Sequence, residues 1–166
     1  MIVDLLRNDL GKIAETGTVK VTALAQLQSF PGVHHLVSHI QAVCRANISP
    51  LQAFKACFPG GSITGAPKLR AMEIISELEP HNRGIYTGSL GYIDYRGQMD
   101  LNIAIRTIIY KYPSYFIPVG GGIVADSVPL DEYEETLHKG KALIHALLSQ
   151  KGFSSWEINC LNRSFN

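Results

Sequence analysis

The chain has 166 residues, of which 46% are hydrophobic and 17% are charged. This length suits a single domain, and this composition is apolar enough to bury a core. The formal net charge of +1 offers no basic surface for a nucleic acid or a membrane. These values argue against a nucleic-acid-binding or membrane-bound protein and favour a small molecule as the binding partner.

The number and spacing of the cysteines indicate the redox state of the compartment in which the protein occurs. Cys44, Cys57 and Cys160 are an odd number and lack CxxC spacing, so neither a disulfide framework nor a zinc site is expected. No hydrophobic run approaches membrane-spanning length, and the opening MIVDLLRND carries an acid and no cleavage region, unlike a signal peptide. We therefore expect a protein of the reducing cytoplasm.

Two helices and two strands are predicted in the first 58 residues. Helical spacing of apolar residues predicts a helix over residues 2–11, which opens in mid-pattern without an N-cap. Residues 17–27 and 33–46 are rich in Val, Thr and Ile and bounded by Gly or Pro, as strands are. Ser49 and Pro50 then suit the cap and first turn of a short helix to about Phe58.

The stretch FPGGSITGAPK, residues 58–68, is predicted to be a binding loop. Thr64 can cap a following helix that begins near Ala66, with Pro67 in its first turn. The first N–H groups of a helix lack intrahelical partners and lie at the positive end of its dipole. They suit a carboxylate or phosphate, although an ordinary capped turn is the alternative.

A phosphate-binding P-loop is excluded at this stretch. Gly60 and Gly65 have the required spacing. The next residues are Ala66 and Pro67, where that motif needs Lys followed by Ser or Thr.

The second half predicts strands and one long helix. Strand-like runs cover residues 84–94, 99–110 and 114–125, with short turns that make antiparallel neighbours. A helix is expected from Pro129 to about Gln150. Residues 1–150 thus predict an α+β domain with a largely antiparallel sheet covered by helices, and residues 151–166 form a tail to which we assign no structure.

Arg106 is the first candidate ligand-binding residue outside the loop. Period-two alternation in MDLNIAIRTIIY places Arg106 and Ala104 on the face opposite Ile103 and Ile105. A guanidinium in a strand, beside a small residue, could bind a carboxylate through two parallel hydrogen bonds. An arginine on a solvated sheet face is the alternative.

The segment GGGIVADS is a second candidate. Gly120 and Gly122 partly match a dinucleotide fingerprint, but that motif opens a helix directly, and here the next helix waits until Pro129. Backbone without side chains would still let a ligand approach closely. A bulge or a tight bend is the alternative.

The last helix carries a charged patch. Glu132, Glu135 and Lys139 fall on the face opposite the apolar stripe that includes Gly140 and Ile144. They form either a solvated face with an i,i+4 ion pair or, with a third ligand from elsewhere, a Mg²⁺ site.

Histidines mark the predicted second strand. In VHHLVSHI, His35 and His39 share a face, and His34 lies on the other. Two histidines on one face of a strand without a nearby third ligand do not indicate zinc. A histidine here could instead donate a proton near neutral pH.

Taken together, five stretches of this sequence resemble the chorismate-utilising enzymes, the family of anthranilate synthase component I, aminodeoxychorismate synthase component I and isochorismate synthase. The resemblance covers about residues 1–148 and lies in MIVDLLRNDLGK, FPGGSITGAPKLRAMEII, YTGSLGY, MDLNIAIRT and GGGIVADSVPLDEYEET. Within the family, FPGGSITGAPK and VHHLVS are most similar to the aminodeoxychorismate branch, whereas anthranilate synthases more often read FPAGTLSGAPK.

The resemblance implies a role for each candidate residue. The Mg²⁺ ligands that anchor the ring carboxylate of chorismate would be Glu132 and Glu135, with Lys139 near that carboxylate. The enolpyruvyl carboxylate would be held by Tyr92, Arg106, Gly120 and Gly122. The loop at the ring carboxylate would comprise Ser62, Thr64, Gly65 and Ala66, and His35 would act as an acid beside the departing hydroxyl group.

The implied reaction replaces the 4-hydroxyl group of chorismate by an amino group, on the para-aminobenzoate branch of folate synthesis. Mg²⁺ is the implied cofactor, and ammonia would come from a separate glutaminase subunit. Arg106, Thr64 and Glu135 would then converge on one small diacid. Anthranilate synthesis is the near alternative, and a noncatalytic ligand-binding or subunit-interaction fragment is another.

The chain also departs from the family pattern. The resemblance implies a further N-terminal portion with a catalytic lysine in a Pro-Ile-Lys-Gly-Thr segment, and a metal-binding acid just before MIVDL. Neither occurs in this sequence. We therefore expect Met1 to be an internal methionine of a longer protein, and the 166 residues alone to bind chorismate weakly and turn over little.

Overall fold

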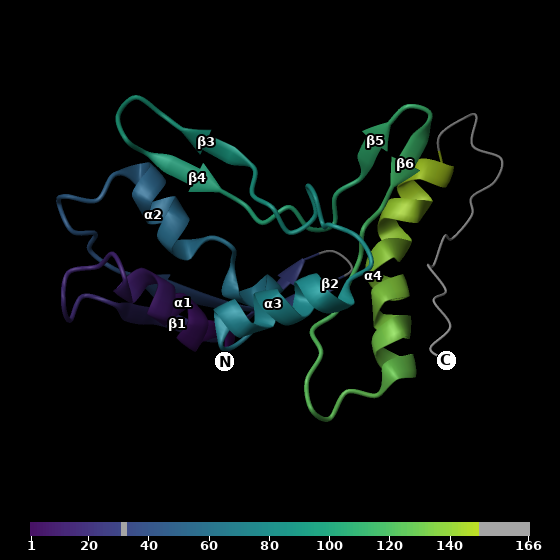
Figure 1. The fold of residues 1–166 in the computed structure, drawn as a ribbon, viewed down its shortest axis with the longest axis horizontal. Helices are drawn as coiled ribbons and strands as arrows, with labels where there is room; N and C mark the ends of the chain where they lie inside the picture. The colour runs from purple at the N-terminus through teal and green to yellow at the C-terminus, as the bar shows by residue number, and fades with distance from the viewer. Residues whose placement is uncertain (31–32, 150–166) are drawn as a thin grey trace. The chain divides into compact units, whose positions relative to one another are not determined.

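The computed structural model describes residues 1–30 and 33–149, and the chain divides into two compact units, Met1–Ala104 and Ile105–Asn166. The first unit contains α1 (Ile2–Gly11), β1 (Lys20–Phe30), β2 (Val33–Gln41), α2 (Pro50–Cys57), η1 (Gly61–Ile63), α3 (Lys68–Leu78), β3 (Gly91–Ile93) and β4 (Met99–Leu101). The second contains β5 (Ile109–Lys111), β6 (Ser114–Phe116) and α4 (Pro129–Leu148) (Figure 1).

The helices follow their sequence signals closely. α1 has the predicted bounds. At α2, the Ser49 hydroxyl accepts from the Gln52 N–H over 3.3 Å, and the Gln52 side chain accepts from the Ser49 N–H over 2.8 Å. This reciprocal capping box satisfies two donors that the helix leaves unpaired. α4 begins at Pro129 as predicted and ends at Leu148. The predicted end at Gln150 and the tail from 151 to 166 lie outside the described residues.

β1 and β2 form an antiparallel hairpin with a bulge. Ala23 pairs with His39 and Gln26 pairs with Val37, so two residues of β1 lie opposite the single residue Ser38. Ala25 has a positive φ of 47°, and its N–H donates to the Ser38 hydroxyl over 2.9 Å. A bulge of this kind bends its strand and redirects neighbouring side chains. The exposure pattern of β2 changes at the same place, because His35 and Val37 are half-buried but His39 is exposed.

The later strands are shorter than predicted. β3 and β4 pair over three residues each, and the ladder continues irregularly, because the N–H of Asn102 donates to Leu90 and that of Ala104 donates to Gly88, both over 2.9 Å. β6 ends at Phe116. The prediction of strand through residue 125 is wrong, since within the described ranges no strand pairs with that segment.

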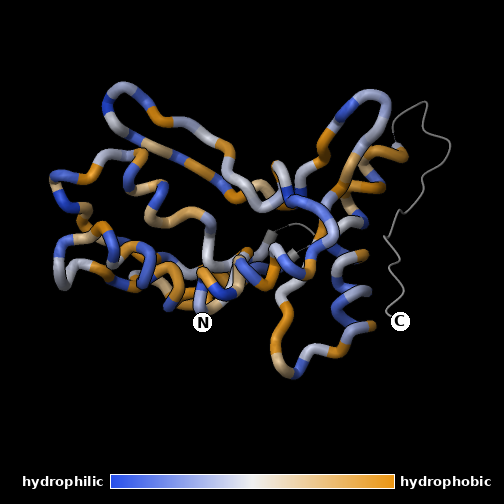
Figure 2. The backbone as a smooth tube through the Cα atoms, viewed as in Figure 1, coloured by the Kyte–Doolittle hydropathy of each residue, from blue (hydrophilic) through white to orange (hydrophobic). Residues whose placement is uncertain are grey.

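The α+β class with antiparallel pairing is confirmed, and the pairing is divided among three two-stranded sheets. Among the described residues only Ile13, Ala14 and Ala104 are buried hydrophobic residues. Large apolar side chains such as Leu27 and Leu36, a cross-strand pair, are exposed. Figure 2 shows the hydropathy of the described residues along the backbone. None of the helices that the structure describes is long and apolar enough to cross a membrane.

Candidate functional site

The predicted site residues divide between the two units. The first unit holds His35, Ser62, Thr64, Gly65, Ala66 and Tyr92. The second holds Arg106, Gly120, Gly122, Glu132, Glu135 and Lys139. The convergence of Arg106, Thr64 and Glu135 on one diacid stays a prediction.

The loop between α2 and α3 rests on α1. Its first turn is the 3₁₀ helix η1, in which Gly61 is buried. A Cβ atom on Gly61 would lie 2.7 Å from the Cβ atom of Leu5, a distance that real Cβ atoms do not adopt. Only glycine therefore lets the loop approach α1 this closely.

Thr64 does not cap α3. Its hydroxyl donates to the Gly60 carbonyl over 3.0 Å, which closes the 3₁₀ turn upon itself. Pro67 occupies the N-cap position without a side-chain cap bond. The predictions of a Thr64 cap and of Pro67 in the first turn are therefore wrong, and α3 begins at Lys68, two residues after the predicted Ala66.

Backbone N–H groups remain available in this loop. The amides of Gly65 and Ala66 make no hydrogen bond to any residue in the described ranges, and they directly precede the N-terminus of α3. Ser62 and Ala66 are exposed, and Gly65, with a φ of +154°, is half-buried. Free N–H groups beside a helix N-terminus suit an anion such as a carboxylate, and the binding role of Ser62, Gly65 and Ala66 stays a prediction.

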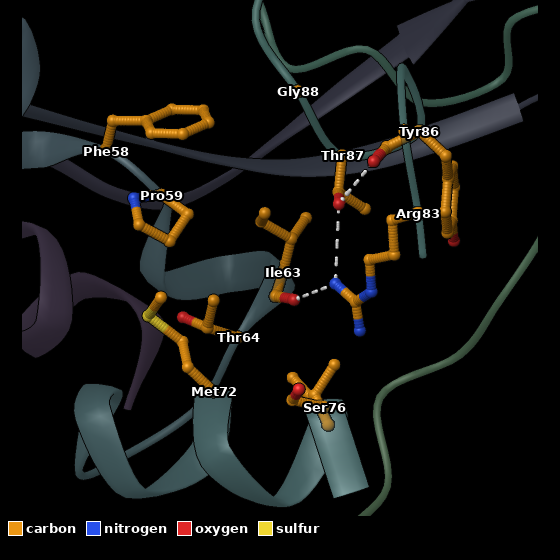
Figure 3. A pocket seen from close by; sticks show the side chains of 12 residues that line it. Phe58, Pro59, Ile63, Thr64, Met72, Ser76, Arg83, Tyr86, Thr87 and Gly88 are labelled. Atoms are coloured by element: carbon orange, nitrogen blue, oxygen red, sulfur yellow. Dashed lines mark hydrogen bonds between the residues drawn. The ribbon is translucent and has the colours of Figure 1, made fainter. Parts of the chain in front are cut away.

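A cavity of about 220 Å³ lies beside the loop. Figure 3 shows Arg83 reaching across it to the Ile63 carbonyl, to which its Nη1 donates over 2.7 Å. Its Nε and Nη2 atoms donate to the two carboxylate oxygens of Glu79 over 2.9 and 2.6 Å, and the hydrogen bond to Glu79 raises the pKa of Arg83. All three nitrogen atoms of the guanidinium thus donate hydrogen bonds, and the group supports the loop from this side.

Arg83 was not predicted as a functional residue. The i,i+4 spacing of Glu79 and Arg83 indicates an ion pair. The contact with Ile63 spans 20 residues, so no local pattern could have found it.

A buried carboxylate supports the loop from its other side. Asp9 is 2% exposed, and it pairs with Lys68 over 2.6 Å and with Lys12 over 2.9 Å. Sequence reasoning did not single out Asp9. Its signal was available, since Asp9 follows Leu5 by four residues and therefore lies on the buried face of α1.

His35 and Tyr92 lie on strands of the first unit. His35 is half-buried on β2, opposite Gln28 of β1, so its imidazole is only partly accessible to solvent. Tyr92 lies on β3 opposite Asp100 and is 58% exposed. Within the described residues no cluster of three or more His, Cys, Asp or Glu could hold a metal ion.

Arg106 does not lie in a strand. It occupies a bend between β4 and β5, with an exposed side chain and a positive φ of 50°. The predicted alternation fails here because an L-residue in the left-handed region turns the chain out of the extended conformation. Such strain at a non-glycine residue is most frequent at functional sites.

In the second unit, the glycine segment packs against α4. A Cβ atom on Gly121 would lie 3.1 Å from Oε2 of Glu132, and Lys139 Nζ donates to the Gly120 carbonyl over 3.3 Å. Gly122 is exposed with nothing within 4 Å of its Cβ position. The structure thus places Gly121 against Glu132 and Gly120 against Lys139.

The three charged residues of α4 are not equally exposed. Glu135 forms an ion pair with Lys139, and the hydrogen bond from Lys139 lowers the pKa of Glu135. Glu132 is half-buried, and Ser127 donates to its Oε1 over 2.5 Å. The prediction that all three lie on a face opposite the apolar stripe is therefore only partly right, because the glycine segment covers part of Glu132.

Glu132 fits the role of a metal ligand. Its Oε2 atom is buried and has no hydrogen-bond partner among the described residues. An unpaired carboxylate oxygen is unfavourable in a protein interior, and buried charges normally pair or coordinate a metal. Glu132 and Glu135 both offer the oxygen ligands that Mg²⁺ prefers, and further ligands would have to come from outside this pair.

The comparisons with known proteins agree on one family. The model of the chorismate binding enzyme family matches residues 1–145. Anthranilate synthase component 1 of Aquifex aeolicus is 50% identical over 147 residues, which cover 89% of this chain and 30% of that protein. Aminodeoxychorismate synthase component 1 of Klebsiella aerogenes is 50% identical over 149 residues, which cover 90% of this chain and 33% of that protein.

Solved structures give the same result. Anthranilate synthase component I from Streptococcus pneumoniae matches with a TM-score of 0.81 at 45% identity, over 86% of this chain and 33% of that one. A 2,3-dihydroxybenzoate-specific isochorismate synthase from Bacillus anthracis matches with a TM-score of 0.79 at 27% identity, over 90% and 40%. The chain spans about a third of the length of the curated relatives.

Proposed function

The chain belongs to the chorismate binding enzyme family, and we propose that it forms part of an enzyme that replaces the 4-hydroxyl group of chorismate by an amino group. The product would be 4-amino-4-deoxychorismate, the precursor of para-aminobenzoate in folate synthesis. The resemblance of FPGGSITGAPK and VHHLVS to the aminodeoxychorismate branch favours this reaction.

The observation that carries the proposal is the unpaired Oε2 atom of Glu132, buried against the glycine segment. A catalytic domain for a dicarboxylate benefits from a cation, because two negative charges must be held together while a bond breaks. Glu132 and Glu135 would hold Mg²⁺, which when bound supplies charge neutralisation and orients a substrate carboxylate. Lys139, which donates a hydrogen bond to the Gly120 carbonyl, would contribute a further positive charge.

In the first unit, the loop would bind the ring carboxylate. The free amides of Gly65 and Ala66 are donors that a carboxylate can accept from without displacing another bond. Ser62 adds an exposed hydroxyl group. Thr64 would act indirectly, because its hydroxyl is already bonded to Gly60 and keeps the loop in its turn.

Arg106, Tyr92 and Gly122 would bind the enolpyruvyl carboxylate. The exposed guanidinium of Arg106 can give two parallel hydrogen bonds to one carboxylate. The phenol of Tyr92 can add a third donor. Gly122, with open space at its Cβ position, leaves room for the substrate.

His35 would act as the proton donor to the departing hydroxyl group. Protonated imidazole can transfer a proton to the 4-hydroxyl oxygen as the allylic C–O bond breaks, so that water leaves. Ammonia forms the new C–N bond, and the resulting ammonium group loses one proton. We place the reaction in the cytoplasm, with ammonia from a separate glutaminase subunit.

Anthranilate synthesis is the second candidate. It is favoured by the anthranilate synthase component 1 of Aquifex aeolicus, which is as similar to this chain, at 50% identity, as the aminodeoxychorismate relative. The two products differ chemically, since anthranilate has lost pyruvate and aminodeoxychorismate keeps its enolpyruvyl group. A noncatalytic ligand-binding or subunit-interaction fragment would yield neither.

Gene disruption in the source organism would test the proposal with the protein as it occurs. We expect growth to require para-aminobenzoate, and extracts to lose formation of 4-amino-4-deoxychorismate from chorismate and ammonia. A requirement for tryptophan, with loss of anthranilate formation, would support the second candidate instead. Unchanged growth and unchanged levels of both products would contradict both.

A further inference from the structure

We propose that Lys68 is a positioning residue, which ties both ends of the binding loop of residues 58–67 to α1 through the buried carboxylate of Asp9. The inference rests on the proposed function, in which this loop binds a carboxylate of chorismate. It assigns to Lys68 a role in holding the loop, distinct from contact with the substrate.

The ion pair of Asp9 and Lys68 is sheltered from solvent. The side chain of Asp9 is 3% exposed and that of Lys68 is 15% exposed, and the Oδ2 and Nζ atoms lie 2.6 Å apart. A charge this deeply buried is tolerated only when it is paired. The pair therefore links α1 to the start of α3 more firmly than a surface ion pair would.

The same ammonium group also reaches the other end of the loop. Lys68 Nζ donates to the carbonyl of Cys57 over 3.5 Å. Cys57 is the last residue of α2 and Lys68 is the first of α3. The ammonium group of Lys68, the residue that follows the loop, thus contacts both Cys57, the residue that precedes the loop, and Asp9 of α1.

α1 supports the middle of the loop as well. Leu5 lies one helical turn before Asp9, and its side chain packs directly on Gly61. The helix therefore contacts the loop at two points on one face, once through an apolar contact and once through an ion pair. Two fixed points leave the intervening turn, with the free amides of Gly65 and Ala66, little freedom to move.

Positioning matters for an anion site made of backbone amides. Such donors bind a carboxylate well only when they are already oriented, because ordering a loop on binding costs free energy. Lys68 is a poor candidate for direct contact with substrate, since its side chain is only 15% exposed and its ammonium group is paired with Asp9. Lys68 would therefore affect substrate binding indirectly, by keeping the loop amides in their orientation.

The chain offers a matched control in Lys12. Lys12 pairs with the other oxygen of Asp9 over 2.9 Å, but none of its hydrogen bonds reaches the loop in the described structure. Lys12→Met and Lys68→Met each remove one lysine from Asp9 and leave the other in place. Lys68→Arg keeps the charge and can still pair with Asp9.

The test is amide hydrogen exchange by NMR on the wild-type chain and these three variants. In Lys68→Met, the amides of Ile63 and Thr64, which hold the 3₁₀ turn, are expected to exchange at least about tenfold faster, the effect of losing a charged hydrogen bond. Amides of the β1–β2 ladder should keep their wild-type rates. Lys12→Met should leave the loop unchanged, and Lys68→Arg should restore most of the protection.

A titration of the same samples with chorismate supplies the second readout. The NMR chemical shifts of the Gly65 and Ala66 amides measure binding to the loop. We expect the Kd for chorismate to rise about tenfold in Lys68→Met. In Lys12→Met, the Kd should stay within about twofold of the wild-type value. Unchanged loop exchange in Lys68→Met, or equal acceleration across the whole first unit, would overturn the positioning role. Faster loop exchange together with no chorismate-induced shift in the wild type would support that role and contradict the proposed function.

Discussion

Ser127 donates its hydroxyl hydrogen to Oε1 of Glu132 over 2.5 Å, while Oε2 of the same carboxylate is buried without a partner in the described structure. Ser127 lies just before α4 and also accepts from the Val124 N–H over 3.0 Å. The hydroxyl group therefore orients the carboxylate and leaves one oxygen for a cation. This arrangement leads to the first prediction.

Glu132→Gln is expected to stabilise the protein without Mg²⁺ and to reduce its response to Mg²⁺. The substitution removes a negative charge whose buried oxygen is unpaired, which is unfavourable when no cation is present. It also removes a metal ligand, so Mg²⁺ binding should weaken at least about tenfold. Thermal unfolding without Mg²⁺, and an NMR titration with MgCl₂ that follows the Gly121 amide, measure the two effects.

The matched control for this prediction is Glu134→Gln. Glu134 is an exposed acid of the same helix and is not part of the proposed site. Its substitution should change neither the unfolding midpoint without Mg²⁺ nor the Mg²⁺ titration. Equal effects of the two substitutions would show that Mg²⁺ responds only to the general charge of α4.

Gly61→Ala should destabilise the first unit by about 1–3 kcal/mol, the usual range for overpacking. The new methyl group would lie 2.7 Å from the Cβ atom of Leu5, which cannot move away without a shift of α1. Urea denaturation measures the change in the free energy of unfolding. Gly11→Ala is the control, because nothing lies within 4 Å of its Cβ position and alanine at a helical site is neutral or stabilising.

Cys57 should react slowly with iodoacetamide below pH 9. Burial, and after it the negative charge of Asp9, raises the pKa of the Cys57 thiol from its ordinary value of 9.0, and only the thiolate is nucleophilic. Asp9→Asn removes one of the raising influences and should accelerate alkylation at fixed pH. Peptide mass spectrometry after timed labelling measures the rate, and an unchanged rate in Asp9→Asn would show that Asp9 does not act on this thiol.

The same shift predicts a dependence of stability on pH. Because the folded-state pKa of Cys57 lies above the unfolded value of 9.0, the folded state binds the thiol proton more tightly. The resulting stability is fully present below pH 9 and is lost as the pH rises through the folded-state pKa. Urea denaturation between pH 7 and 10.5 should show this loss in the wild type and a smaller loss in Cys57→Ala.

The 166-residue chain alone is expected to bind chorismate weakly and to turn over little. It spans about a third of its curated relatives, and its two predicted Mg²⁺ ligands are too few for a complete site. Incubation with chorismate, ammonium and MgCl₂, followed by mass spectrometry, measures the products. Sustained formation of aminodeoxychorismate by this polypeptide alone would contradict the prediction.

Several features could be predicted from the sequence because neighbouring residues decide them. Ser49, Pro50 and Gln52 determine the start of α2 through contacts within one turn. Pro129 likewise marks the start of α4. The charged residues of α4 and the glycines near residue 121 were recognised by residue type and spacing, and the structure packs these two segments together.

Other features were not predicted because the conformation that the folded backbone adopts overrides the intrinsic preference of a residue. The strand pattern around Arg106 is strong, yet the residue bends out of it with a positive φ. Thr64 is a residue type that commonly caps helices, but its hydroxyl group donates a hydrogen bond to the Gly60 carbonyl instead. In each case a contact or conformation outside the local pattern prevailed over an intrinsic preference.

The sequence alone determined the helices, the antiparallel class and the family, since these depend on residue order, periodicity and motif spacing. Only the tertiary structure decided that Asp9 is buried between Lys12 and Lys68, and that one oxygen of Glu132 is left unpaired. Whether a charge is paired depends on which segments fold against it, and spacing along the chain does not record that. The support of the loop and the state of the candidate metal ligand are therefore properties of the folded protein.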